Sequence, residues 1–503
     1  MQTVPTQEVQ IVAPFEVATT GAKTNFLQRI CTALFNPVDI SFLVFFRILF
    51  GGIMLWEVYR YFTYGWIRRY YVEPAITFGY YGFSWVKPWP GRGMYIHFFV
   101  LGLAAACVMV GFLYRIAAPV FFLAFTYCFL LEQTRYLNHL YLVCLIGFLM
   151  CFLPAERACS VDSLLRRKIR SAVVPAWTLW LLRVQVGIPY FFGGVAKLNS
   201  DWIHGGEPMR TWLRPLTKMP AFGPIFTSDW VVYFFVAGGL MLDLLVVPLL
   251  LWRRTRLFVL PAAIAFNLMN AVIFDIGIFP WFMLGALLIF LPPDLLRRLA
   301  GAFMSPPDAS SQASLKTTGT PESTSCPSLL PSQKLVAGLL AGYLAVQLFL
   351  PLRHYLYPGN VSWTEEGHNF SWHMKLRTKV GQAVFTVTHP LSGQTWTIKP
   401  EDYLESHQVM KMITKPDLIL TFSHYLAEEK RREGYENVEV RARVMVSLNG
   451  REPQLLVDPT VDLAKEHVSL LPASWIVPLT TPLESRGPRS FGNEPTDAAD
   501  VPF

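Results

Sequence analysis

The chain has 503 residues, of which 53% are apolar and 16% are charged, with a formal net charge of +8 and a mean hydropathy of +0.36. The apolar residues recur in stretches of about 20, the length that crosses the hydrocarbon core of a bilayer. This composition excludes an ordinary soluble globular protein. The basic residues cluster between the stretches without an aromatic-interleaved stripe, so we expect no nucleic-acid partner.

Nine candidate spans follow a polar N-terminal tail. We predict that residues 1–36 form a cytoplasmic tail with a short surface helix, and that residues 37–300 form a transmembrane catalytic bundle. A linker rich in Ser, Thr and Pro at 301–332 leads to a last span at 333–353. The expected spans are residues 39–60, 94–114, 117–134, 138–154, 175–196, 229–251, 257–275, 277–293 and 334–353.

Clusters of arginine and lysine predict how the spans are oriented. Such clusters lie at Arg166–Arg170, Arg253–Arg256 and Arg297–Arg298, after the fourth, sixth and eighth spans. Cytoplasmic loops are enriched in these residues, so we place the N-terminus inside the cell and residues 354–503 outside the cytoplasm.

The C-terminal 150 or so residues have the pattern of a soluble domain. Alternation at Val384–Thr388 and Thr395–Ile398, separated by a Pro- and Gly-containing turn, predicts a β-hairpin, and Val438–Ser447 predicts a further strand. Helical patterns cover residues 400–412 and 415–433. The predicted fold is therefore a polytopic α-helical membrane bundle of about nine spans followed by a soluble, β-rich α+β external domain.

Polar residues inside the predicted spans gather near the outer face. Lys197 ends the fifth span, and Asn138 with His139 begins the fourth. An ammonium group in hydrocarbon is costly, so such a lysine is at an interface, paired, or deprotonated, and a buried neutral amine can act as a base. Taken alone, each residue has a simpler interpretation, such as a snorkelling lysine or an interfacial histidine. The seventh span adds Asn267, Asn270 and Asp275 towards the same face.

Convergence of these groups beneath an external domain indicates a polar site that opens to lipid, which suits a lipid-soluble cofactor. The pattern itself does not identify that cofactor. The seven cysteines match no zinc or redox spacing, and we expect no structural metal.

At these residues the chain resembles the vitamin K-dependent γ-glutamyl carboxylase family. The resemblance covers roughly residues 36–475 and depends on many short segments in the same order. The segments are Asn36–Asp39, Phe46–Gly51, Asn138–Leu142, Ser160–Asp162, Gly194–Trp202, Met269–Asn270, Ile276–Phe279, Gln347–Pro351 and Ser371–Met374.

The resemblance implies γ-carboxylation of glutamate residues, coupled to oxygenation of vitamin K hydroquinone to its 2,3-epoxide. The implied cofactor is vitamin K hydroquinone or menaquinol, with O2 and CO2 as co-substrates and no metal. The implied partners are a glutamate-containing exported protein or peptide, membrane lipid, and a quinone reductase that recycles the cofactor.

The resemblance also implies roles for particular residues. Lys197 is the expected base for the hydroquinone, and His139 is tied to the carboxylation half of the chemistry. Residues expected to bind the cofactor are Asn138, Tyr190, Asn270, Phe279 and Met374. Residues expected to contact the substrate are Asn267, His368 and Trp372.

This sequence departs from the animal members of that family. Asn267 replaces a histidine, His368 replaces a tyrosine, and the disulfide that joins the two parts of the animal enzyme cannot form because Cys326 is the last cysteine. We therefore expect a shorter, bacterial homologue in the inner membrane, or an endoplasmic reticulum protein with a lumenal domain if the source is eukaryotic.

Three functions are compatible with the sequence. The first is a complete carboxylase, and the second is a quinol epoxidase without glutamyl carboxylation. The third is a non-catalytic transporter or export-accessory protein, which would need a polar pathway reaching both faces of the membrane. The polar residues cluster at the outer face, which favours the two enzymatic functions.

Overall fold

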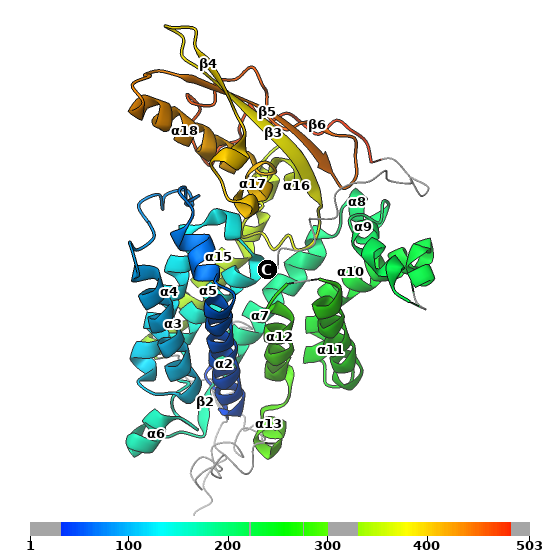
Figure 1. Cartoon of the computed structure of the whole chain (residues 1–503). Coiled ribbons are helices and arrows are strands. Elements are labelled where there is room, and N and C mark those ends of the chain that lie inside the picture. The colour runs from blue at the N-terminus through cyan, green and yellow to red at the C-terminus, as the bar shows by residue number, and fades with distance from the viewer. Residues whose placement is uncertain (1–31, 221–222, 275, 300–329, 484–503) are drawn as a thin grey trace, which may run out of the picture.

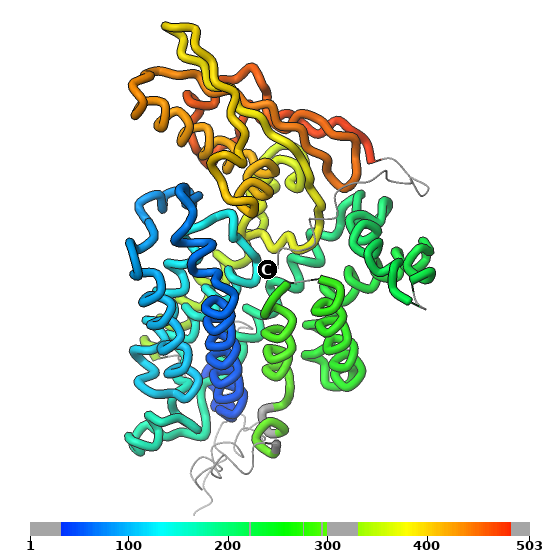
Figure 2. Tube along the Cα trace, viewed as in Figure 1, coloured from blue at the N-terminus to red at the C-terminus, as the bar shows by residue number. Residues whose placement is uncertain are grey.

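The computed structural model describes residues 32–220, 223–274, 276–299 and 330–483. Most of the predicted N-terminal tail, most of the linker and Asp275 lie outside these residues. The described part has two layers, an apolar helical bundle and an extramembrane domain that sits over one end of it (Figures 1 and 2).

Seven helices in the described part of the chain are long and apolar enough to cross a membrane. They are α2 (Ser41–Thr63), α3 (Gly93–Val110), α4 (Tyr114–Leu131), α7 (Ala176–Ala196), α10 (Asp229–Leu251), α11 (Arg256–Ile273) and α15 (Pro331–Leu352).

Two further apolar helices correspond to the fourth and eighth predicted spans but are shorter than predicted. These are α5 (Asn138–Met150) and α12 (Phe279–Ala286), which continues as a 3-10 turn to Phe290. At about 1.5 Å per residue, a helix of this length covers about 20 Å, less than the full hydrocarbon thickness. The predicted membrane bundle is confirmed, whereas a count of nine full-length spans is only approximate.

Short elements connect the bundle helices. The strands β1 (Pro37–Asp39) and β2 (Val173–Pro175) pair antiparallel. The short helices are α6 (Val161–Leu165), α8 (Ser200–Ile203), α9 (Met209–Leu213) and α13 (Pro293–Leu299), with a π-helical turn at Arg68–Val72. Both α6 and α13 lie at the end of the bundle opposite the extramembrane domain, as the predicted orientation requires (Figure 1).

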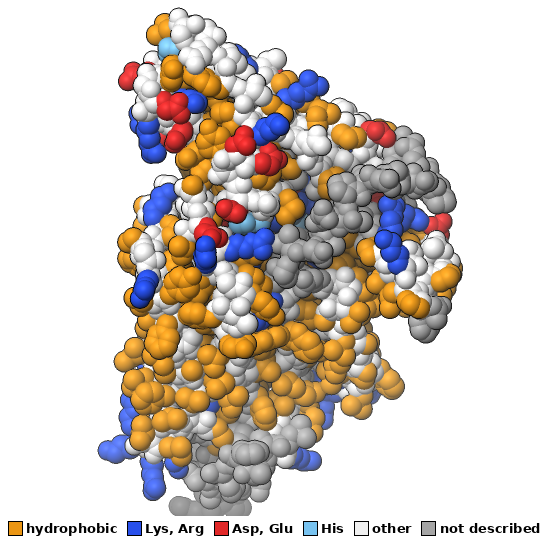
Figure 3. Space-filling view, in the orientation of Figure 1, with side chains coloured by type: hydrophobic (Ala, Val, Ile, Leu, Met, Phe, Trp, Pro, Cys, Tyr) orange, Lys and Arg blue, Asp and Glu red, His pale blue; other side chains and the backbone are white. Residues whose placement is uncertain are grey.

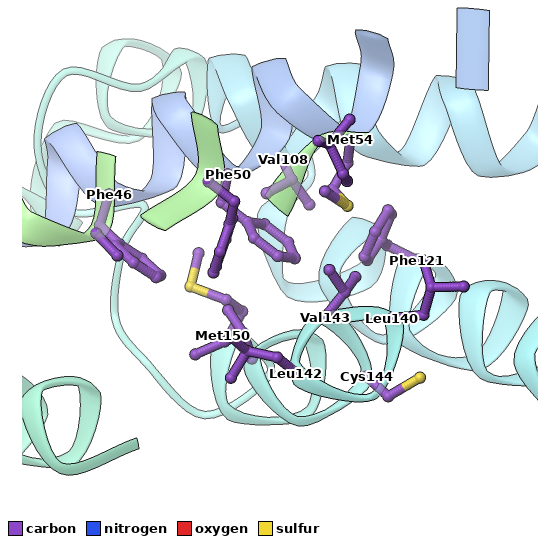
Figure 4. Packing of buried hydrophobic residues seen from close by; sticks show 14 of the residues in the cluster. Phe46, Phe50, Met54, Val108, Phe121, Leu140, Leu142, Val143, Cys144 and Met150 are labelled. Carbon is purple, nitrogen blue, oxygen red and sulfur yellow. The ribbon is translucent and has the colours of Figure 1, made fainter. Parts of the chain in front are cut away.

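The bundle core is aromatic and tightly packed where α2, α3, α4 and α5 meet (Figure 4). The Phe50 and Phe121 rings pack edge to face, with their centroids 5.3 Å apart. A Cβ atom at Gly51 would lie 2.6 Å from the backbone nitrogen of Met109. Only glycine therefore allows α2 and α3 to approach so closely.

The outer surface of the bundle is apolar. Figure 3 shows a broad hydrophobic band around the helices, with Lys and Arg side chains gathered beyond its lower edge. On α11, Leu257, Phe258 and Val272 are each about four-fifths exposed, at 79%, 81% and 79%. Such exposure is stable in lipid and unfavourable in water, so the chain is an integral membrane protein.

The extramembrane domain contains a four-stranded antiparallel sheet in the order β4-β3-β5-β6. In the central pair, Lys379 lies opposite Leu448 at one end and Thr388 opposite Glu439 at the other. The predicted hairpin and third strand are confirmed. The strands are β3 (Lys379–Thr388), β4 (Thr395–Ile398), β5 (Glu439–Leu448) and β6 (Gln454–Leu455).

Helices cover the face of the sheet that is turned towards the bundle (Figure 1). They are α16 (Val361–Thr364), α17 (Ser406–Met412) and α18 (Pro416–Arg432). The helix predicted at 400–412 begins later, because Pro400–Asp402 forms a separate 3-10 turn. The loop after α2 contributes Ile76 and Phe78 to this domain's hydrophobic core, so the core spans both layers.

Polar contacts fasten the two layers together. Arg451, after β5, forms a bidentate ion pair with Asp201 of α8, with both N–O distances at 2.6 Å, and Asn449 donates a further hydrogen bond to the same carboxylate. Gln133, in the 3-10 turn that follows α4, donates to Asp417 of α18 at 2.5 Å. The extramembrane domain is therefore tied to the bundle at two separate places.

We predict that Arg451→Ala destabilises the protein more than Arg441→Ala. The Arg451–Asp201 side chains are only 7% and 13% exposed, and removing one partner of a buried pair costs about 3–5 kcal/mol. The Arg441–Glu439 pair is 41% and 26% exposed, and such pairs contribute about 0–1 kcal/mol. Thermal unfolding in detergent measures both variants, and equal losses would contradict a special role for the Arg451 pair.

Candidate active site

Lys197 lies immediately after α7 and is buried against α10. Its Nζ donates to Oδ2 of Asp243 at 2.5 Å and to the carbonyl oxygen of Gly193 at 3.3 Å. The two side chains of the ion pair are only 8% and 5% exposed. Lys197 is therefore neither a snorkelling side chain nor an isolated one.

Two consecutive glycines allow α7 and α10 to approach closely enough for this pair. A Cβ atom at Gly194 would lie 2.7 Å from the Leu244 side chain and 3.1 Å from its backbone nitrogen. At Gly193 an added Cβ would lie 3.4 Å from Asp243 Oδ2. The Gly-Gly sequence thus sets the helix separation that brings the carboxylate to Lys197.

Asp243 is a candidate site residue that the sequence did not single out. It is the one acidic residue within the interior of α10, a 23-residue apolar helix whose other carboxylate, Asp229, lies at its first position. A lone carboxylate inside a membrane span is expensive and has a partner or a function. That signal was present in the sequence, but the identity of its partner was not.

Trp202 is the third group beside the Lys197 amine, after the Asp243 carboxylate and the Gly193 carbonyl oxygen. Asn199 caps α8 by accepting a hydrogen bond from the Trp202 backbone at 3.0 Å, which fixes the start of that helix. The Trp202 indole donates to the carbonyl oxygen of Val236 on α10 at 3.1 Å. Lys197 Nζ lies 5.3 Å from the indole ring, within the range of a cation–π contact.

A loop of the extramembrane domain covers the site from above. Its residues Phe370, Trp372 and Lys375 have φ values of 66°, 59° and 51°, a left-handed conformation that is unfavourable for side chains of this size. In the same loop Met374 reaches α7, where its Cε would lie 3.0 Å from a Cβ added at Gly193. Strain of this kind persists only where the surroundings impose it, and it is concentrated at functional sites.

Asn138 anchors this loop to the start of α5. Its Nδ2 donates to the carbonyl oxygen of His373 at 3.1 Å, and its Oδ1 accepts from Tyr136 Oη at 3.0 Å. The same tyrosine oxygen accepts from the Phe370 backbone nitrogen at 2.6 Å. Asn138 therefore positions residues 370–374 over the bundle.

Several buried polar atoms of the loop have no hydrogen-bond partner among the described residues. They are Trp372 Nε1 and both ring nitrogens of His373. The His354 and His368 rings lie 4.7 Å and 5.4 Å from the His373 ring. Unpaired buried donors and acceptors are costly, so they are candidates for ligand contacts.

Burial and neighbouring positive charges keep the histidines of the loop neutral. Burial, the neighbouring His354 and Arg377, and Lys197 lower the pKa of His373 to about 3. Burial and Arg377 also hold the pKa of His368 well below its usual value. Arg377 contacts His368 Nε2 and forms an ion pair with Glu365 at 2.6 Å. Both histidines are therefore neutral at physiological pH.

The remaining candidates form two further groups. Asn267 of α11 donates to Tyr190 Oη at 3.3 Å and to the carbonyl oxygen of Ala263 at 2.8 Å, so it supports a neighbouring helix. Asn270 lies three residues later on α11 and is half-buried. The His139 ring stacks on Phe279, with centroids 5.7 Å apart and an interplanar angle of 30°.

The structure thus brings Lys197, Met374, Trp372 and His373 to one place, with Asn138 supporting them. Among the described residues, His139 forms no hydrogen bond or ion pair with Lys197. Within the described ranges, no three His, Cys, Asp or Glu side chains are grouped as a metal site would require.

Comparison with known protein families gives two matches. Residues 35–295 match the HTTM domain, and residues 332–482 match the lumenal domain of vitamin K-dependent gamma-carboxylase. The first match alone covers half of the chain, and the second covers the extramembrane domain with the last span. No solved structure matches the chain.

We predict that acidification from about pH 7 to about pH 5 lowers the thermal stability, because His373 and His368 stay neutral when folded but take up protons near about pH 6.5 when unfolded. The unfolded state then binds more protons, so stability falls as the pH falls. His373→Gln should flatten this dependence, whereas His389→Gln, on the exposed hairpin turn, should not. If thermal stability fell equally with pH in the unaltered protein and in both variants, His373 would not be neutral in the folded state.

Proposed function

The chain belongs to the vitamin K-dependent γ-carboxylase family, and from this premise we propose that it carboxylates glutamyl side chains of an exported protein. We further propose that this reaction is coupled to oxygenation of vitamin K hydroquinone, or of menaquinol, to its 2,3-epoxide. The observation that carries the proposal is the buried Lys197–Asp243 pair beneath the extramembrane domain.

The residues around Lys197 suit a hydroquinone. A flat bicyclic ring with two hydroxyl groups needs apolar walls and a few hydrogen-bonding groups. Met374 supplies apolar surface, and the unpaired His373 nitrogens supply the polar contacts. Asn138, Tyr190, Asn270 and Phe279 complete the set that we propose for the cofactor site.

When bound, the reduced vitamin supplies electrons for oxygenation and, through that reaction, the basicity needed to remove a γ-proton from glutamate. Lys197 receives the proton of a phenolic hydroxyl group. The extramembrane loop excludes water, so that solvent does not protonate the strong base that removes the γ-proton. CO2 then adds to the deprotonated γ-carbon of the peptide.

His139 serves the carboxylation half of the reaction. Its ring is held against Phe279 rather than against Lys197, which supports separate roles for the two residues. A ring nitrogen of His139 is the group that we propose to steady the glutamyl carboxylate or the carbanion.

The peptide substrate binds on the extramembrane side through His368 and Trp372. Nearby Arg377 and Lys379 share Glu365, with N–O distances of 2.6 Å and 3.1 Å. Burial lowers the pKa of Lys379 to about 8 in spite of that carboxylate. A positive environment of this kind suits the anionic glutamyl side chain. Asn267 influences the substrate site indirectly, because its hydrogen bond to Tyr190 Oη holds that side chain in place.

The setting follows from these assignments. We propose a bacterial inner-membrane enzyme whose extramembrane domain faces away from the cytoplasm and receives exported glutamate-containing proteins. A membrane quinone reductase regenerates the cofactor, which reaches the site through the surrounding lipid.

We predict that Lys197→Ala abolishes both products, because the base is gone. The assay supplies purified protein in nanodiscs with vitamin K hydroquinone, O2, labelled bicarbonate and a glutamyl peptide, and reads epoxide and fixed label from one tube. Lys399→Ala, at an exposed position, is the matched control and should retain both activities. Epoxide at the normal rate from Lys197→Ala would remove Lys197 from the mechanism.

The same tube separates the alternative functions. Epoxide without fixed label from the unaltered protein would favour a quinol epoxidase. Neither product from folded protein would favour a non-catalytic role.

His139→Ala should reduce carboxylation at least tenfold more than epoxidation, because this residue acts after the cofactor has been oxygenated. The ratio of fixed label to epoxide measures the effect, with His389→Ala as the control. An equal loss of both products would instead indicate a role of His139 in folding or cofactor binding.

A further inference from the structure

The surroundings of Lys197 favour an ammonium ion. Its Nζ contacts the Asp243 carboxylate at 2.5 Å, a backbone carbonyl oxygen at 3.3 Å and the face of an indole ring at 5.3 Å. Each of these groups attracts positive charge. An ammonium ion has no lone pair, so in this state Lys197 cannot accept a proton from a hydroquinone.

Among the described residues, Lys197 is the one hydrogen-bond donor to the Asp243 carboxylate. Asp243 is 5% exposed and lies in the interior of an apolar helix, so solvent is almost excluded as an alternative partner. The carboxylate therefore has room to accept a proton from the amine that it contacts.

We propose that Asp243 is a positioning residue that takes up the proton released by Lys197 when Lys197 accepts one from a phenolic hydroxyl group. This inference rests on the proposed role of Lys197 as the base. It makes the base a pair of residues rather than a single amine.

The step is balanced. The hydroxyl O–H bond breaks and a new N–H bond forms at Lys197 Nζ, while another N–H bond of the same nitrogen breaks and an O–H bond forms at Asp243 Oδ2. Lys197 gives its proton to Asp243 as it takes up the phenolic one, so it passes through the neutral amine and is an ammonium ion again at the end, while Asp243 becomes a neutral carboxylic acid. The negative charge passes from the carboxylate to the phenolic oxygen.

This arrangement avoids creating charge in a site of low dielectric constant. A lone neutral lysine that deprotonated a phenol would produce two new buried charges, each with a desolvation cost of several kcal/mol. With Asp243 present, one positive and one negative charge exist both before and after the transfer. The ion pair is thus already arranged to accept a proton before the hydroquinone binds.

The test compares Asp243→Asn and Asp243→Glu with Asp229→Asn. Asp229 lies on the same helix but at its exposed end, in an ion pair with Arg210, so it is the matched control. The first readout is the rate at which a small amine-reactive reagent labels Lys197 without any quinol, followed by mass spectrometry. The second is the pH profile of epoxide formation.

For Asp243→Asn we expect faster labelling of Lys197, because an amine without its counter-charge is more often neutral when buried. We expect epoxide formation to fall at least tenfold at neutral pH and to recover as the pH rises. Asp243→Glu and Asp229→Asn should keep the slow labelling and the flat pH profile of the unaltered protein. The other titratable groups that face the pair, Tyr190 and His373, are unchanged in all variants.

An unaltered labelling rate and pH profile in Asp243→Asn would overturn the proposal. If that variant does not fold, a steep pH dependence in folded Asp243→Glu would overturn it as well, since a carboxylate would then be insufficient. These failures differ from failure of the proposed function, which would appear as the absence of epoxide or of fixed label from the unaltered protein. They also differ from failure of the proposed role of Lys197, which would appear as epoxide formation that survives Lys197→Ala.

Discussion

The burial of one ion pair, Lys197 with Asp243, constrains much of the surrounding architecture. Removing two charges from water is costly, and the cost is recovered only where the geometry is close and water stays out. The Gly193–Gly194 step provides the close approach of α7 and α10. Trp202 fills the remaining side through its bond to α10. Local sequence and helix packing therefore serve the same electrostatic requirement.

The extramembrane domain contributes residues to the candidate site around Lys197. The loop at 370–375 carries the strained residues, and Asn138 and Tyr136 of the bundle hold it by hydrogen bonds. The Arg451–Asp201 ion pair adds a second attachment only a few residues beyond Lys197. The extramembrane domain thus covers the buried lysine and limits the access of water to it.

The two faces of helix α11 have different surroundings. Helix α11 presents large apolar side chains outward and Asn267 inward, where it contacts Tyr190 of α7. The apolar face of α11 therefore meets lipid, whereas the candidate site lies on the inner side of the bundle, beneath the extramembrane domain. The candidate site lies at the boundary between the two layers, where Lys197 and the loop at 370–375 come together.

The sequence by itself determined the membrane bundle and the sheet-containing domain, and it singled out Lys197 as a candidate, because hydropathy, alternation and a charge in an apolar stretch are local properties of the chain. It did not show the lengths of α5 and α12, which end where packing and turns allow. The partner of Lys197 is 46 residues away on another helix, and only the relative rotation and spacing of α7 and α10 decided that Asp243 faces it. The loop residues 370–374 likewise came to Lys197 through contacts between the two layers, which no pattern along the chain encodes.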